Sequence, residues 1–126
     1  MKIALDSNAY SDFMRGQEWL DAMQQAEKIM LPLFVLGELR SGFLQGNRHT
    51  RNEADLARFI NTPRVEVLLP DASTTRHYAA LVAQLRKQGT PIPTNDVWIA
   101  ALALQHDLIL CTSDQHFEHI PHLARW

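Results

Sequence analysis

Short apolar runs alternate along the chain with longer segments in which apolar positions recur every three or four residues. A short apolar run bounded by polar residues is typical of a buried strand, and the wider spacing is typical of an amphipathic helix. The runs predict strands at about Lys2–Leu5, Ile29–Leu31, Val65–Leu68 and Leu108–Cys111, with a weak last strand near Leu123–Trp126.

Helical patterns fill the intervals between these runs, and glycine or proline follows most of them. The predicted helices cover Ser7–Met14, Glu18–Glu27, Leu33–Leu44, Glu53–Ile60, a segment capped by Asp71 or Ser73 that runs through Lys87, and Asp96–Gln105 preceded by a capping Thr94. Strands that alternate with helices predict an α/β fold with a parallel sheet and helices on both of its faces. Because no repeat, low-complexity tract or linker interrupts the pattern, we expect residues 1–126 to form a single domain.

Composition narrows the class of protein. The 126 residues are 46% hydrophobic, which suffices for one core, and the formal net charge is only −2. Cys111 is the single cysteine, so we expect no disulfide framework and a reducing, cytoplasmic location. The opening MKIALDSN turns polar too soon for a signal peptide, and no run is long enough to span a membrane.

Four acidic residues stand where an apolar run meets a helical segment: Asp6, Glu38, Asp96 and Asp114. Side chains that follow the strands of a parallel sheet converge at its carboxyl edge. Carboxylates that gather there raise one another's pKa, and divalent cations, which select oxygen ligands, relieve the repulsion. The four acids therefore predict a metal-dependent enzyme.

Each acid also has a simpler interpretation. Asp6 and Asp114 are suitable helix caps, and Asp96 is suitable for the first turn of a helix, where the dipole favours a negative charge. Glu38 lies among apolar residues, yet it could face solvent and pair with Arg40 or Arg15. Only the joint occurrence of all four at corresponding positions favours a site.

The motifs DSN, GEL, NDVWIAA and TSDQHF follow one another in an order that resembles the PIN-domain nucleases, in particular the VapC-type toxins of bacterial toxin–antitoxin pairs. The resemblance extends over almost the whole chain, including GTPIPTNDVWIAALAL and the closing DQHFEHIP. The commoner first motif is DTN, and Ser7 keeps the hydroxyl of that threonine. The stretch Gln45–Pro63 carries no motif of the family.

This resemblance implies an α/β/α sandwich and a Mg²⁺- or Mn²⁺-dependent endoribonuclease that acts on structured RNA such as tRNA or rRNA. It also implies a homodimer that is neutralised by a cognate antitoxin, whose C-terminal segment blocks the site. In these terms Asp6, Asp96 and Asp114 are metal ligands, and Glu38 binds a second metal or orients the attacking water. Asn8 and Thr112 match the small polar residues that support the carboxylates.

Other candidates are weaker. His116, His119 and His122 are spaced like ligands of a zinc site, but we interpret them as surface or capping residues, with His116 near enough to contact substrate. Four arginines are candidates for contacts with an RNA backbone, although a solvated face is the simpler reading: Arg15, Arg40, Arg48 and Arg51.

Three further functions stay open. A phosphoacceptor domain, such as a receiver or a haloacid-dehalogenase-type phosphatase, also places Asp at strand ends, but such sites use a late lysine and none follows Lys87. A non-catalytic interaction module is conceivable through the apolar segment Leu33–Leu39 and the WIAALAL helix. A PIN-fold nuclease with a housekeeping RNA-processing or DNA-directed role is the third.

Overall fold

In a computed structural model that describes residues 1–16 and 18–126, four parallel strands form one sheet in the order β3-β2-β1-β4. The strands are β1 (Lys2–Leu5), β2 (Lys28–Pro32), β3 (Val65–Leu68) and β4 (Ile109–Cys111). In the central strand β1, Ile3 pairs with Ile29 of β2 and with Ile109 of β4. Ile3, Ala4 and Leu5 are fully buried, as expected for a parallel strand that is covered on both faces.

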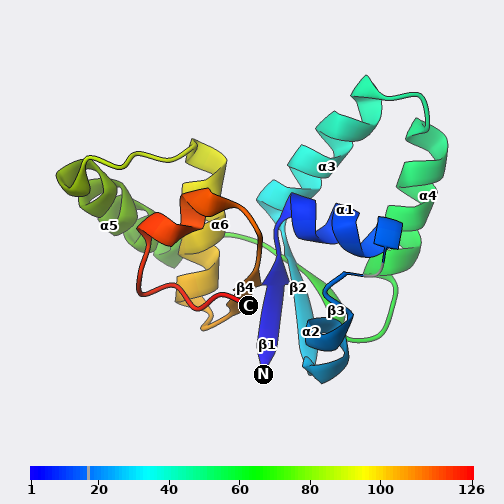
Figure 1. Ribbon diagram of the computed structural model, residues 1–126, viewed down its shortest axis with the longest axis horizontal. Helices are drawn as coiled ribbons and strands as arrows, with labels where there is room; N and C mark the ends of the chain where they lie inside the picture. Colours follow the sequence, from blue (N-terminus) through cyan, green and yellow to red (C-terminus); the bar gives the residue numbers. More distant parts are fainter. Residues whose placement is uncertain (17) are drawn as a thin grey trace.

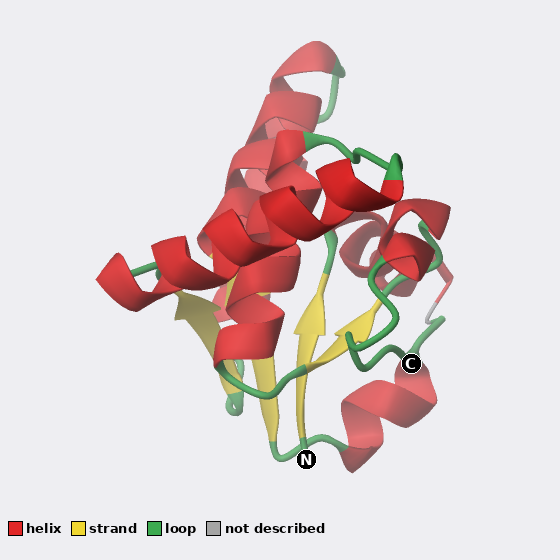
Figure 2. Cartoon of the chain, turned by 90° about the vertical axis from the view of Figure 1, so that its left-hand side faces the viewer, coloured by secondary structure: helices red, strands yellow, loops and turns green. Residues whose placement is uncertain are grey.

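Helices cover both faces of this sheet. They are α1 (Ser7–Gly16), α2 (Leu20–Gln25), α3 (Leu33–Gln45), α4 (His49–Ile60), α5 (Ala72–Gln88), α6 (Thr94–Gln105) and the 3₁₀ helix η1 (Gln115–His119). Figure 1 places α5 and α6 on one side of the strands and α1, α2 and α4 on the other, and Figure 2 shows the strands side by side between these layers. The predicted α/β sandwich with a parallel sheet is confirmed.

Several element boundaries differ from the prediction. The weak last strand is reduced to one isolated parallel bridge between Leu110 and Arg125. Helix α4 begins at His49, four residues before the predicted Glu53, because the N–H of Asn52 donates to the carbonyl of Arg48 at 2.9 Å and closes an extra turn. Thr94 does not cap α6: the helix already includes it, and the N-cap is Pro93, whose side chain makes no capping hydrogen bond.

Helix α2 is shorter than the predicted Glu18–Glu27, and both of its ends have a physical cause. Trp19 has a φ of 70°, in the left-handed region, so it is the N-cap and α2 begins with the next residue, while the Trp19 carbonyl accepts the N–H of Met23 at 2.9 Å. At the other end the Arg64 guanidinium donates to the carbonyl of Met23 at 2.9 Å and to that of Ala26. A side chain 41 positions away thus satisfies carbonyls that a longer helix would have used.

The buried hydroxyl of Thr74 joins α5 to α6. Asp71 caps α5 in a capping box with Thr74, as predicted for Asp71, and the Thr74 hydroxyl also donates to Gln105 Oε1 at 2.6 Å. Replacing the fully buried Thr74 by valine should lower the free energy of unfolding by about 1–3 kcal/mol, because Gln105 Oε1 loses a donor and the backbone N–H of Asp71 loses an acceptor. Thr75→Val is the matched control, since Thr75 is exposed and bonds only the carbonyl of Ala72. Equal effects of the two substitutions in urea denaturation would contradict the prediction.

The topology directs polar side chains to one edge. The strand that follows β1 along the chain, β2, lies on one side of β1, and the last strand, β4, lies on the other. Connections that leave neighbouring strands in opposite directions open a crevice at the carboxyl end of the sheet, where α/β proteins bind their ligands. Within the described residues, every helix is too short or too polar to cross a membrane.

Candidate active site

Asp6 lies at the base of this crevice, directly after β1, and only 4% of its surface is exposed. Its Oδ1 accepts the N–H of Ala9 at 2.8 Å, so the carboxylate does cap α1. Its Oδ2 accepts the hydroxyl proton of Thr112, which follows the neighbouring strand β4. The Thr112 oxygen in turn accepts the N–H of Asp114 at 3.0 Å. Both oxygens of Asp6 are therefore held in place by groups from the two ends of the chain.

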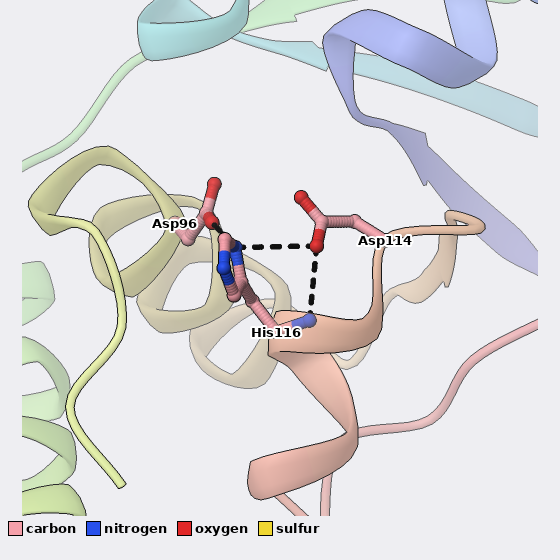
Figure 3. Close-up of side chains that lie close together, drawn as sticks. All are labelled: Asp96, Asp114 and His116. Carbon is pink, nitrogen blue, oxygen red and sulfur yellow. Dashed lines mark hydrogen bonds and ion pairs between the residues drawn. The ribbon is translucent and has the colours of Figure 1, made fainter.

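Asp96 and Asp114 face one another across the same crevice (Figure 3). Asp96 belongs to the first turn of α6, and its side chain is 12% exposed. Asp114 is the N-cap of η1 and accepts the N–H of His116 at 2.9 Å. The His116 ring stands between the two carboxylates: its Nδ1 is 2.9 Å from Asp96 Oδ2 and 3.2 Å from Asp114 Oδ1.

Glu38, on α3, is the fourth acid, and it is half-buried. Burial raises its pKa and the charge of Asp96 raises it further, while hydrogen bonds from Ser7 and Asn95 act in the opposite direction. The two arginines proposed from the sequence as partners of Glu38 pair elsewhere, since Arg15 contacts Asp12 at 2.8 Å and Arg40 contacts Glu53 at 3.2 Å. Neither arginine therefore neutralises Glu38, and the charges of Asp96 and Asp6 act on it.

The four acids interact electrostatically. Burial raises the pKa of Asp6, the bonds from Thr112 and Ala9 lower it, and the charges of Asp114 and Asp96 raise it again. Burial likewise raises the pKa of Asp96, with His116 opposing and Asp114 adding to the shift. Among the described residues, neither Asp6 nor Glu38 forms an ion pair with a lysine or arginine. The crevice is thus a concentration of negative charge that lacks a basic counterpart from Lys or Arg.

This arrangement predicts a pH dependence of stability. Because the folded-state pKa of Asp6 lies above its unfolded value, the folded chain binds the proton more tightly, and stability falls as pH rises through the folded pKa. The wild type should therefore lose thermal stability between about pH 4 and pH 7 relative to Asp6→Asn, whose side chain does not ionise. Melting temperatures of the wild type and of Asp6→Asn, each measured at both pH values, give the contribution of the Asp6 carboxyl group. A melting-temperature difference between the two proteins that does not change with pH would contradict the prediction.

The donor atoms suit a divalent cation. One ligand atom from each of Asp96, Asp114 and His116 lies within 4.8 Å of the other two. Carboxylate oxygens are the ligands that Mg²⁺ and Mn²⁺ take most readily, and a cation bound there would offset the repulsion between the two carboxylates. Cys111 is not available as a further ligand or nucleophile, because burial raises the pKa of its thiol to about 12.

A comparison with protein-family models now decides the family. The model described as "PIN domain" matches residues 3–123 of the chain. The chain belongs to the PIN-domain family. Several of its relatives are named VapC. It is 41% identical over 125 residues to Ribonuclease VapC1 of Haemophilus influenzae (strain R2866), an alignment that covers 94% of this chain and 92% of the relative.

Solved structures of VapC-containing complexes share the whole PIN fold of this chain. A crystal structure of DNA-bound VapBC from Salmonella typhimurium superposes with a TM-score of 0.87 at 27% identity, covering 100% of this chain and 97% of that one. VapBC-5 from Mycobacterium tuberculosis, a member of the VapBC family of toxin–antitoxin systems, gives a TM-score of 0.76 at 27% identity, with coverage of 98% and 93%. The resemblance inferred from the motifs, to the PIN family and to its VapC members, is confirmed.

The resemblance implies that two small polar residues, Asn8 and Thr112, support the carboxylates, and the structure places only Thr112 in contact with one of them. Thr112 bonds Asp6 directly. Asn8 is exposed, and within the part of the chain that the structure describes its side chain bonds none of the carboxylates, so a supporting role for it stays a prediction.

Three residues of the quoted motifs, for which the sequence predicts no contact with the acids, lie beside them. Ser7 and Asn95 bond Glu38, and each is a sequence neighbour of a predicted acid, which is the signal that could have identified them. His116 joins the cluster, whereas His119 and His122 lie outside it.

Proposed function

We propose that this chain is a divalent-cation-dependent endoribonuclease and the toxin of a toxin–antitoxin pair. The observation that carries the proposal is the convergence of Asp6, Glu38 and Asp96, whose pKa values are raised by burial, with the Asp114 carboxylate. Within the described residues none of the four pairs with an arginine or a lysine. The names of its relatives support the reaction, since VapC1 of Haemophilus influenzae is named a ribonuclease. The solved neighbour from Mycobacterium tuberculosis supports the biological role, since it belongs to a family of toxin–antitoxin systems.

Asp96 and Asp114 would hold the cation, and Asp6, which follows β1, would add a third carboxylate to the site. When bound, a Mg²⁺ or Mn²⁺ ion lowers the pKa of a water and offsets charge on the phosphate. Glu38 is the best base in the cluster for orienting and deprotonating a water, because it is half-exposed and its pKa is raised. The Thr112 hydroxyl donates to Asp6 and accepts the backbone N–H of Asp114, so it orients both residues. The carboxylates would therefore move little when a cation binds.

We infer that the substrate is structured RNA in the cytoplasm, with tRNA and rRNA as the first candidates. Arg48 and Arg51 are exposed at the start of α4 and, within the described residues, form no ion pair. They are therefore available for phosphate contacts, whereas Arg15 and Arg40 are engaged with acids. An antitoxin segment that carries an arginine would complement the unpaired carboxylates, and a homodimer is the assembly that we propose for the free toxin.

Mapping of RNA ends tests the function. After induction in a bacterial host, sequencing of RNA 5′ ends should reveal new ends at one or a few positions in tRNA or rRNA, together with growth arrest. The ends should be absent for Asp96→Asn and should disappear when a small protein encoded beside the toxin is co-expressed. Identical ends from the Asp96→Asn variant would reject the nuclease assignment, and an interaction module would then be the better account.

A further inference from the structure

His116 is held against both carboxylates of the cluster by two separate constraints. Its backbone N–H donates to Asp114 Oδ1 at 2.9 Å, which fixes the start of η1. The next residue, Phe117, is fully buried and anchors the same turn in the core. The imidazole therefore reaches the gap between Asp96 and Asp114 from a rigid backbone, although 48% of the side chain remains exposed (Figure 3).

The two distances from the imidazole nitrogen fit neighbouring corners of one coordination sphere, and all three donor atoms lie within 4.8 Å of one another. Ligands at adjacent corners of an octahedron with bonds of about 2.1 Å are separated by about 3 Å. The distances from His116 Nδ1 are 2.9 Å to Asp96 Oδ2 and 3.2 Å to Asp114 Oδ1. A neutral imidazole carries its proton on one ring nitrogen only, so Nδ1 offers a lone pair when the proton is on Nε2.

A nitrogen donor changes which metals such a site prefers. Mg²⁺ takes oxygen ligands almost exclusively and keeps several waters, whereas first-row transition-metal ions accept imidazole readily. The two carboxylates of the cluster supply negative charge that attracts any divalent cation. The imidazole nitrogen favours those cations that accept nitrogen ligands.

We propose that His116 is a direct metal ligand through Nδ1, which gives this site a preference for first-row transition-metal ions over Mg²⁺. The inference rests on the proposed metal-dependent function and adds a fifth residue to its machinery. His119 provides the internal contrast, because it lies on the same 3₁₀ helix, is exposed, and is outside the cluster.

Pulsed electron paramagnetic resonance of Mn²⁺ bound to the full chain tests the assignment at a pH where imidazole is neutral. The wild type and His119→Asn should show hyperfine coupling from a directly bound ¹⁴N, and His116→Asn should lose it. Asparagine keeps a hydrogen-bond donor near the Nδ1 position but has no basic nitrogen, so it separates a ligand from a mere hydrogen-bonding partner. In titrations, His116→Asn should weaken Mn²⁺ binding about 10- to 100-fold and Mg²⁺ binding much less.

The outcomes separate this inference from the proposed function. Mn²⁺ that binds the wild type without ¹⁴N coupling, or coupling that persists in His116→Asn, would overturn the role of His116 and leave the metal-dependent nuclease intact. Equal losses of Mn²⁺ and Mg²⁺ affinity in His116→Asn would overturn the metal preference. Failure of the wild type to bind either ion would overturn the metal-dependent function itself, and the inference with it.

Discussion

Asp6→Asn is expected to lower the rate of RNA cleavage by at least about 100-fold, the usual loss when one preorganised charged or polar group is removed from an active site. Asp6 is the most buried of the four acids, and both of its oxygens are held by hydrogen bonds. Asparagine preserves the size of the side chain and removes only the charge that faces the crevice. The rate should be measured on a purified RNA substrate at saturating Mg²⁺ or Mn²⁺.

The fold should survive this substitution. The amide oxygen of asparagine can accept the N–H of Ala9, and the amide nitrogen can donate to the Thr112 hydroxyl, which has two acceptor lone pairs. Because the buried charge of Asp6 is removed, the melting temperature at pH 7 should be equal to or above that of the wild type. Asp12→Asn is the matched control, since Asp12 lies on α1 and pairs with Arg15 outside the crevice. Cleavage by Asp6→Asn at the rate of the control would refute the assignment.

Phe117→Ala is expected to lower the free energy of unfolding by about 3–5 kcal/mol, the range for truncating a buried aromatic residue. Phe117 is fully buried beside Ile120 and Leu123, which are also in the core. Its loss would remove the anchor of η1, between Asp114 and the end of the chain. Because a domain of this size is stable by only about 5–15 kcal/mol, much of the total would be lost.

Urea denaturation measures this effect, and Glu118→Ala is the control. Glu118 is the exposed neighbour of Phe117 on the same turn, so its truncation should change the free energy of unfolding by less than about 0.5 kcal/mol. If Phe117→Ala and Glu118→Ala cost the same, η1 would not depend on the core for its position. Metal affinity should also fall in Phe117→Ala under conditions where the chain remains folded, because Asp114 and His116 flank the residue.

The sequence predicted the fold and the location of the four acids well, and both successes have one cause. Apolar runs such as those of β1 and β4 are buried on both faces, so they stand out from amphipathic helices, and residues that follow them share an edge by topology. Asp6 and Asp114 could thus be placed together from the sequence, whereas Asp96 follows no strand and is assigned to the site by the NDVWIAA motif.

Side-chain contacts that cross between elements could not be predicted in this way. The bond from Arg64 to the carbonyls at the end of α2 shortened a helix from 41 positions away, and no local pattern announces it. The sequence predicts His116 as a surface or capping residue near enough to contact substrate, and it does not predict contacts with Asp96 and Asp114. Its actual position depends on a turn that is fixed by Asp114 and Phe117 together. The local sequence pattern therefore predicts the carboxyl edge of the sheet as the place of the site, but not which side chains contact the acids there.

The hydrogen bond between Asp6 and Thr112 joins residues that are 106 positions apart in the chain. A ribosome that has synthesised Asp6 must extend the chain by that distance before the Thr112 hydroxyl and the Asp114 carboxylate exist. The strand pairing that brings them together, between β1 and β4, has the same long separation and forms late by its loop-closure entropy. A growing or prematurely terminated polypeptide thus carries only half of the acidic crevice, and the translating ribosome is not exposed to an assembled site until synthesis is nearly complete.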